Sequence, residues 1–440
     1  MHSFYLHKIV YYIGGACAVL YMAGYFLSPL YPIASLVLIL LLIVLITDFL
    51  FLYIKKYPLQ ASREVADRLS LNDENKVSIH LVNKYAFPVS LQVIDELPVQ
   101  LQIRNWQRNV KIEANASTTL EYVIKPLSRG QYQFDDINLL VVGPLQLAKR
   151  KVQIKAKQIV KVYPSFIEMR RFQLLAIGNR LQEAGVKRIR KFGHSSEFEQ
   201  IKEYVRGDDY RTINWKATSR RGSLMMNNFT DEKSQQIYCV INKGRLMKMP
   251  FEGMTLLDYS INAALILSNV ALVKQDKAGL ITFAEKQDSF LIADKQPGQM
   301  NLILESLYKQ ETNFLEADYE KLYATIRNKL TNRSLLVLFT NFESLDGLKR
   351  EMPALQRIAH YHLLVVVFFE NTAIKSLVQS KADNLEEVYI KTIAEKFVFE
   401  KKQMIKELQQ HGILSILTSP EHLTINTINK YLELKNRNYI

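Results

Sequence analysis

The chain has 440 residues, which is enough for two or three domains. Hydrophobic residues make up 48% of it and charged residues 23%, so the composition excludes disordered and collagen-like proteins. The formal net charge of +14 suits an anionic partner, while two cysteines are too few for a disulfide framework or a multi-cysteine zinc site.

Two long apolar segments lie near the N-terminus. Residues 9–27 carry no charge, and residues 33–54 carry Asp48 alone. Each segment is long enough for a transmembrane helix, and a proline-containing break at 28–32 separates them. We therefore predict two transmembrane helices within residues 1–56. A cleaved signal peptide is the alternative, but it would have a shorter apolar core and no second span directly after it.

Basic residues predict the orientation of this hairpin. Lys8 precedes the first span and Lys55 and Lys56 follow the second, whereas the connecting loop has no lysine or arginine. The positive-inside rule then puts both termini in the cytoplasm, in a multi-pass protein of the inner (cytoplasmic) membrane. We expect Asp48 near the membrane interface, because two helices alone enclose no ion pathway.

Residues 61–164 alternate between apolar and polar positions in short segments such as KVSIHLVN and TTLEYVIKPL. Clusters of turn-forming residues separate these segments. Several short strands without intervening helices predict an immunoglobulin-like β-sandwich. No residue pattern in this region is typical of catalysis, so we expect a spacer or an interaction platform.

Residues 165–235 connect the predicted sandwich to the C-terminal region, and their first part is basic. Glycines at 178, 185 and 193 interrupt any long helix, which predicts an exposed loop over residues 165–191. This loop is either a solvated surface or a contact to anionic lipid or an acidic protein face. We do not expect nucleic acid, because no reader motif is present. The candidate partner-binding residues here are Arg170, Arg171, Lys187, Arg188, Arg190 and Lys191.

The segment 197–232 mixes acids, bases and one of the two tryptophans, Trp215. Asp208 and Asp209 follow Gly207, which suits a turn or a helix N-cap. We predict a structural clasp in which Trp215 anchors the segment on the following domain and nearby arginines pair with the acids. The alternative is an exposed recognition surface.

Residues 236–440 alternate apolar strand patterns with helical patterns. This alternation predicts an α/β domain whose mainly parallel sheet is covered on both faces. Ligands of such sheets bind beyond the carboxyl ends of the strands. Two of these ends are residues 242–245 and 340–343.

The segment that begins at residue 197 resembles the signature of a bacterial domain-of-unknown-function family, the fifty-eighth of that naming series. The residues that match are Glu197, Phe198, Lys202, Tyr204, Gly207, Asp208, Asp209, Arg211, Ile213, Trp215, Lys216, Ala217 and Arg220. The resemblance extends over the hairpin, the β-rich region and the α/β region. It implies a membrane-anchored protein with a von Willebrand factor type A-like domain. It also implies a role alongside a MoxR-type AAA+ ATPase in envelope, stress or complex-assembly processes.

Domains of the von Willebrand type commonly carry a metal-ion-dependent adhesion site, with an Asp-x-Ser-x-Ser motif, a later threonine and a later aspartate. Mg²⁺ needs such carboxylate and hydroxyl ligands. Neutral residues hold the matching positions here: Asn242, Gly244, Leu246 and, after a later strand, Asn341. Lys243 and Arg245 add positive charge. We therefore expect a degenerate site, with no metal and no cofactor.

Lys243 and Arg245 are instead candidates for binding an acidic group directly; the alternative is that Arg245 stays solvated or caps a helix. The sequence has no P-loop, no Gly-x-Gly-x-x-Gly, no His-Glu-x-x-His and no Gly-x-Ser-x-Gly. We therefore predict a cytoplasm-facing adaptor that binds proteins and is not an enzyme. The alternative is a metal- or phosphate-dependent enzyme that uses the cleft at the strand ends.

Overall fold

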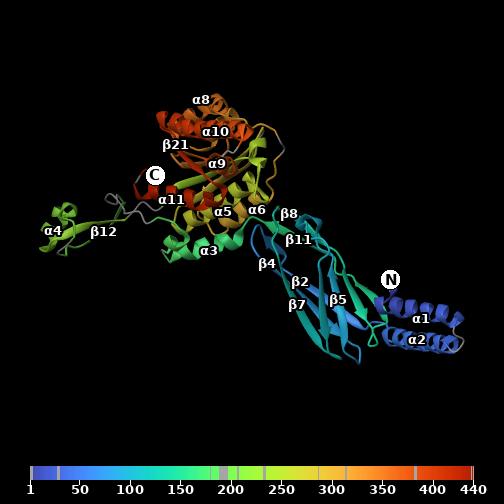
Figure 1. The fold of residues 1–440 in the computed structure, drawn as a ribbon. Helices are drawn as coiled ribbons and strands as arrows, with labels where there is room; N and C mark the ends of the chain where they lie inside the picture. Colours follow the sequence, from blue (N-terminus) through green and yellow to red (C-terminus); the bar gives the residue numbers. More distant parts are fainter. Residues whose placement is uncertain are drawn as a thin grey trace. The chain divides into compact units, whose positions relative to one another are not determined.

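The computed structural model describes residues 3–26, 30–178, 180–187, 197–205, 208–230, 234–285, 287–312, 315–380, 384–437 and 439. They fall into two compact units, Met1–Tyr163 and Pro164–Ile440 (Figure 1).

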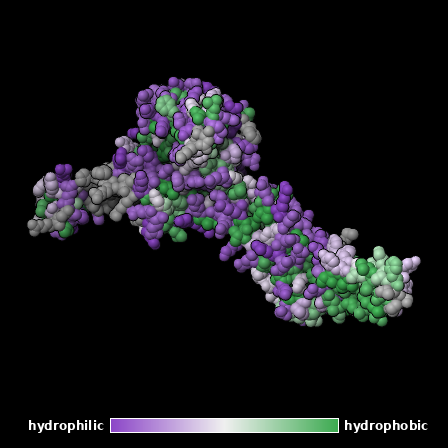
Figure 2. All heavy atoms as spheres, viewed as in Figure 1, coloured by the Kyte–Doolittle hydropathy of each residue, from purple (hydrophilic) through white to green (hydrophobic). Residues whose placement is uncertain are grey.

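Two apolar helices lie side by side in the first unit, α1 (Lys8–Phe26) and α2 (Leu30–Tyr53). Both are long and apolar enough to cross a membrane. Figure 2 shows hydrophobic side chains gathered over them. The two predicted helices are thus present, within a few residues of their predicted bounds. A short strand that was not predicted, β1 (Ser3–Leu6), precedes α1.

The rest of the first unit is β-rich. One sheet has the strand order β1-β10-β9-β5-β6, and two three-stranded sheets have the orders β2-β4-β7 and β3-β11-β8. Buried and exposed residues alternate along the longer strands, so each sheet has one face in the core. The strands are β2 (Leu59–Val65), β3 (Arg68–Ser70), β4 (Asn75–Asn83), β5 (Val89–Asp95), β6 (Gln107–Ile112), β7 (Ser117–Ile124), β8 (Gly130–Phe134), β9 (Ile137–Val142), β10 (Ala148–Ile154) and β11 (Gln158–Tyr163).

Asp48, the single acid of α2, is buried against the turn between β9 and β10. Its carboxylate accepts three backbone N–H groups, from Leu145 at 3.0 Å, Leu147 at 2.9 Å and Ala148 at 2.8 Å. A buried carboxylate needs such partners, because each unsatisfied polar group would cost free energy. Asp48 therefore fastens α2 to the β-rich part of its unit.

Arg150 on β10 makes a second link to the end of α2. Its guanidinium is buried and donates to the carbonyl oxygens of Leu52 and, at 3.0 Å, Lys55. The Tyr85 hydroxyl donates to the same Leu52 oxygen at 2.7 Å. Because β1, just before α1, pairs with β10 as well, both outer ends of the helical pair are held at one strand.

The second unit is built on a six-stranded sheet of order β18-β17-β14-β19-β20-β21. All neighbouring strands are parallel except β18, which pairs antiparallel with β17 at one edge. The strands are β14 (Gln236–Asn242), β17 (Lys277–Phe283), β18 (Gln287–Asp294), β19 (Leu335–Phe339), β20 (Leu363–Phe369) and β21 (Leu414–Thr418).

Helices cover both faces of this sheet. One core packs α3 (Phe166–Ile177), α5 (Leu256–Val273), α6 (Gln299–Tyr308) and α11 (Leu423–Asn436) against one face. The other core holds α7 (Tyr319–Lys329), α8 (Leu345–Tyr361) and part of α10 (Leu385–Gln410). A small helix, α9 (Thr372–Gln379), lies beside α10. Along β14, Ile237, Cys239 and Ile241 face the first core while Tyr238 and Val240 face the second.

The helix α5 is also long and apolar enough to span a membrane. It is buried on nearly every side within the first of these cores, because it packs between the sheet, α3 and α11. A helix that is apolar all round is typical of such a protein interior as well as of a bilayer. Burial therefore assigns α5 to the core of the domain.

One prediction about this unit is wrong: residues 165–191 are not all loop. Residues 166–177 form α3, whose Phe172 and Ala176 are buried against α5. Gly178 ends this helix after three turns, so the glycine limits its length but does not prevent it. Arg170 and Arg171 lie exposed on the helix.

Candidate functional site

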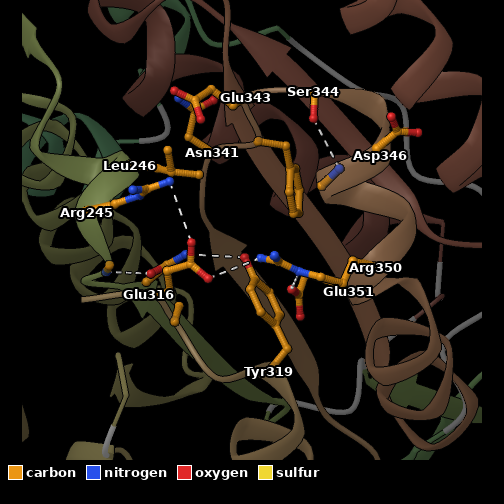
Figure 3. A pocket seen from close by; sticks show the side chains of 15 residues that line it. Arg245, Leu246, Glu316, Tyr319, Asn341, Glu343, Ser344, Asp346, Arg350 and Glu351 are labelled. Atoms are coloured by element: carbon orange, nitrogen blue, oxygen red, sulfur yellow. Dashed lines mark hydrogen bonds and ion pairs between the residues drawn. The ribbon is translucent and has the colours of Figure 1, made fainter. Parts of the chain in front are cut away.

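The carboxyl edge of the six-stranded sheet holds a pocket of about 370 Å³ (Figure 3). The chain runs from β14 to β17 and β18 on one side and then returns to β19 on the other. Loops after β14 and β19 therefore diverge, which is the position where open α/β sheets bind ligands. Residues from the loops 242–246 and 341–347, from the segment 316–319 and from α8 line the pocket.

Asn242 ends β14, and its side-chain amide is fully engaged within the protein. The Nδ2 group donates to Thr340 Oγ1 at 2.9 Å and to the Tyr319 hydroxyl at 3.2 Å, and Oδ1 accepts from Gly244 N at 2.7 Å. Tyr319 and Thr340 share a further hydroxyl contact of 2.6 Å. Burial raises the pKa of Tyr319 well above its usual value, so this phenol is not a base at neutral pH.

Asn341, which follows β19, lines the pocket together with Asn242. Its Oδ1 accepts from Lys401 Nζ of α10 at 3.1 Å, and the same ammonium donates to the carbonyl oxygen of Phe342. Desolvation by burial lowers the pKa of Lys401 to about 8, against an opposing effect of Glu343. At neutral pH a cation therefore occupies the position next to Asn341.

The predicted degenerate metal positions Asn242, Gly244, Leu246 and Asn341 all line this one pocket. The donor set does not fit Mg²⁺: it offers no carboxylate at these positions, and both amide oxygens already accept hydrogen bonds. Among the described residues, no group of three or more histidine, cysteine, aspartate or glutamate side chains could hold a metal ion. That the protein binds no metal in solution stays a prediction.

Charged side chains form the outer wall of the pocket. Figure 3 shows Arg245 and Arg350 converging on Glu316, with distances of 3.6 Å and 3.5 Å between charged atoms. Arg350 also donates to Glu351 at 2.8 Å, and this hydrogen bond raises the pKa of the guanidinium. Ser344 caps α8 by accepting from Gly347 N at 3.2 Å, which fixes the loop that carries Asn341.

The two basic residues predicted at this edge differ in position. Arg245 lines the pocket and pairs with Glu316. Lys243 is buried, and its backbone N–H donates to Phe283 at 2.8 Å. Only Arg245 is therefore placed to meet a ligand in the pocket.

The signature segment forms a β-hairpin, β12 (Glu197–Glu203) and β13 (Met225–Thr230), with α4 (Trp215–Arg221) between the strands. Asp208 pairs with Lys202 at 3.2 Å and accepts from Val205 N, and the latter bond is the main reason that the pKa of Asp208 is lowered. Asp209 accepts from Arg211 N at 2.9 Å and caps a short helical turn. These acids therefore shape the hairpin locally, as their position after Gly207 predicted.

The clasp itself differs from the prediction. Trp215 is 70% exposed and does not anchor the hairpin on the sheet domain. The prediction paired Asp208 and Asp209 with nearby basic residues. Lys202 is the residue that pairs with Asp208. Ion pairs with other described residues are absent for Arg211, Lys216, Arg220 and Arg221. Tyr204, Ile213 and Ala217 are described within the hairpin, whereas Gly207 and the side chains of Glu197 and Phe198 lie outside the described residues.

The candidate basic surface is described in part. Arg170, Arg171 and Lys187 are exposed, and Lys187 N donates to the Asn429 side chain at 2.8 Å. Arg188, Arg190 and Lys191 lie outside the described residues.

Among the pocket residues that the sequence did not predict are Glu316, Tyr319 and Arg350, and it did not predict Lys401, which contacts Asn341, either. They come from α7, α8, α10 and the loop before α7, and no local motif marks them.

Comparison with known proteins relates part of the chain to a family without an assigned activity. Residues 200–378 match the family described as "Protein of unknown function DUF58". The chain is also 26% identical over 250 residues to "Uncharacterized protein YeaD" of Bacillus subtilis (strain 168). That similarity covers 54% of this chain and 60% of the relative. The relative is thus matched over less than two thirds of its length.

Two solved structures of the CARDB domain of the PF1109 protein from Pyrococcus furiosus are similar to a part of the chain. A crystal structure, titled as a complex with di-metal ions, is 18% identical with a TM-score of 0.18, and covers 24% of this chain and 86% of that one. A solution structure of the same domain is 15% identical with a TM-score of 0.17, and covers 24% and 94%. Similarity at this level defines neither the fold nor the ligands of this chain. The resemblance to the fifty-eighth family was predicted over the hairpin, the β-rich region and the α/β region, and the family match supports it over residues 200–378.

Proposed function

We propose that this protein is a membrane-anchored adaptor that binds a protein partner at the carboxyl edge of its six-stranded sheet. The partner is a MoxR-type AAA+ ATPase, as the family resemblance implies. The two apolar helices span the membrane, and both termini lie in the cytoplasm.

The sheet supports a von Willebrand factor A-like fold for the second unit. Numbered along the chain, its strand order is three-two-one-four-five-six, with the third strand antiparallel at the edge. The three sheets of the first unit likewise support an immunoglobulin-like sandwich in that unit.

The state of the pocket at the strand ends carries the proposal. Asn242, Thr340 and Tyr319 satisfy one another, and Glu316 is shared between Arg245 and Arg350. Catalysis needs a nucleophile or base held near a reacting atom, and these groups are engaged in holding the loops. Charged side chains at the rim of the pocket, around hydrogen-bonded polar side chains at its base, suit recognition of a protein surface.

Two observations support the proposed orientation of the hairpin. Lysines flank the outer ends of α1 and α2, and both ends are fixed at β10. The β-rich part of the first unit therefore lies on the side that the positive-inside rule assigns to the cytoplasm.

The test is recovery of the ATPase with the full chain. The chain is solubilised from membranes in detergent, and a MoxR-type ATPase held with a non-hydrolysable nucleotide is sought among the bound proteins. Arg350→Glu should reduce recovery at least tenfold, since it places like charge beside Glu316 and Glu351 at the pocket wall. Lys349→Glu, an exposed neighbour on α8 outside the pocket, is the matched control. Repeated recovery of no such ATPase would refute the partner, and equal loss in both variants would refute the site.

The alternative of a metal- or phosphate-dependent enzyme makes a different prediction. Calorimetry with Mg²⁺ and with inorganic phosphate on the full chain in detergent should show no specific binding. Stoichiometric binding at millimolar concentration or tighter, lost in Asn242→Ala for the metal or in Arg350→Gln for phosphate, would favour the enzyme.

A further inference from the structure

A second cavity, of about 230 Å³, lies on the other side of the loop 341–343 and shares that loop with the first pocket. Its wall is mainly apolar and comes from five segments of the second unit, 249–256, 341–343, 369–374, 397–402 and 417–420. The apolar residues that matter most are Phe251, Phe369, Ile374, Phe397 and Leu417. Two lysines, Lys401 and Lys402, and two glutamates, Glu343 and Glu370, also line it. Lys401 is the partly buried one of the two lysines, and Lys402 is exposed.

Lys401 has a donor to spare. Its ammonium carries three N–H groups, and two of them reach neutral oxygens, those of Asn341 and Phe342. Glu343 acts on it only at long range, and no carboxylate within the described part of the chain forms an ion pair with it. A partly buried ammonium with no carboxylate in direct contact is a recognition element for an anion that enters from outside.

The helix that carries Lys401 also presents an uncovered apolar face. Met404 and Leu408 of α10 are buried in the core. About two and four turns before Met404, at the same helical spacing, Phe397 and Ile390 are 47% and 43% exposed. The face that packs in the core at the C-terminal half of α10 is thus half-exposed at Phe397, which lines the cavity, and at Ile390, while Ala394 between them is buried.

Size decides which class of ligand fits. Pockets for drug-sized molecules and cofactors occupy about 300–1,000 Å³. A cavity of about 230 Å³ suits one or two side chains of a peptide segment, and the uncovered helix face beside it suits further apolar side chains of that segment.

We propose that this cavity binds a segment of a partner protein in which a bulky apolar side chain is followed closely by a carboxylate. The apolar side chain enters between Phe251, Phe369 and Phe397, and the carboxylate accepts the third N–H of Lys401. The segment lies along the uncovered face of α10. This site adjoins the charged pocket of the proposed function, with which it shares the loop 341–343, and the proposal does not depend on which protein supplies the segment.

The experiment uses an array of twelve-residue peptides against the full chain in detergent. Every peptide contains two adjacent Leu or Phe residues, and Asp or Glu follows after one to three positions. A matched peptide carries Asn or Gln in place of the acid. Acid peptides should bind at least tenfold more tightly than their amide counterparts, as a charge-assisted hydrogen bond to a partly buried ammonium implies.

Two variants locate the site. Lys401→Met should abolish the preference for the acid, while Lys406→Met, an exposed lysine on the same helix, should retain it. Phe397→Ala should weaken acid and amide peptides alike. Binding of the acid peptides should fall between pH 7 and pH 9 as Lys401 loses its proton.

Three outcomes would overturn the proposal: no preference for the acid, an unchanged preference in Lys401→Met, or hexanoate binding as tightly as the best peptide. The last result would assign the cavity to small apolar acids. The two proposals can fail independently. If Arg350→Glu loses the ATPase but still binds the acid peptides, the result supports the proposed function and leaves the peptide site unchanged. If Lys401→Met loses the preference for acid peptides but still recovers the ATPase, the two sites act independently.

Discussion

Asp48 in the first unit and Lys401 in the second are both charged side chains withdrawn from water, but their partners differ. Three backbone N–H groups saturate the Asp48 carboxylate. Two of the three N–H groups of Lys401 donate to neutral oxygens, and the third is left for a ligand. Saturation is typical of a structural link, because nothing from outside could improve it. An unsatisfied donor in a cavity is typical of recognition, because a ligand can complete it. Removing each charge should therefore have opposite effects on stability.

The largest expected effect is that of Asp48→Ala. Three buried N–H groups of the turn at 145–148 would lose their acceptor, and we expect a loss of about 3 kcal/mol in the free energy of unfolding of the first unit. Chemical denaturation of the full chain in detergent, followed by protease cleavage at this turn, measures it. Glu121→Ala on the exposed side of β7 is the control and should stay within about 0.5 kcal/mol. A similar small effect for Asp48→Ala would mean that Asp48 is not a structural link.

A smaller loss is expected for Gly143→Ala, at the start of the same turn. A Cβ atom there would lie closer than 3.0 Å to the Asp48 carboxylate, and overpacking of this kind costs about 1–3 kcal/mol. In a chain that already carries Asp48→Ala, the carboxylate that the new Cβ atom would meet is absent. Gly143→Ala should then lower the free energy of unfolding by less than about 1 kcal/mol. Additive losses in the double variant would contradict the close packing of turn and helix.

Lys401→Met should act in the other direction and stabilise the second unit by about 1–2 kcal/mol at pH 7. The folded pKa of Lys401, about 8, lies below its unfolded value of 10.5. The unfolded chain therefore binds more protons between these values, and the stability contribution of Lys401 rises as the pH rises from 8 to 10.5.

The measurement is the difference in unfolding free energy between Lys401→Met and the parent chain as a function of pH. This difference should be largest at or below pH 7 and should shrink by about 2 kcal/mol toward pH 10. Lys406→Met should show no such trend, because Lys406 is exposed. A destabilised Lys401→Met at neutral pH would place Lys401 with Asp48 as a structural link.

The sequence anticipated the features that depend on local pattern. The alternation of strand and helix patterns in residues 236–440 predicted a mainly parallel sheet covered by helices on both faces, which β14, β17, β19, β20 and β21 form together with the antiparallel edge strand β18. It missed β1, which has four residues and is defined by pairing with β10. It also missed α3. The glycines of this region suggested that no helix forms there, but the packing of Phe172 in the core stabilises one.

The candidate site was predicted only where a motif marks it. Asn242 and Asn341 follow strands, and parallel strands bring such positions to one edge. Lys401 is 60 residues from Asn341, and Asp48 is about 100 residues from the turn that it caps. The sequence could not predict the contacts of either charge, because tertiary packing, and not the neighbouring residues in the chain, determines them.

The smallest effect on stability is expected at the charged pocket wall. Glu316→Gln removes the acid that Arg245 and Arg350 share, but all three side chains are more than half exposed. Exposed pairs contribute about 0–1 kcal/mol and are screened by salt. We expect a loss of under about 1 kcal/mol that disappears at 1 M salt, measured by denaturation of the full chain. Asp48→Asn, measured alongside, should keep its larger loss at high salt, because its partners are buried backbone groups. A salt-independent loss above about 2 kcal/mol for Glu316→Gln would show that these charged residues stabilise the fold. The pocket would then resemble the structural contact of Asp48 and would not be a surface available to a partner.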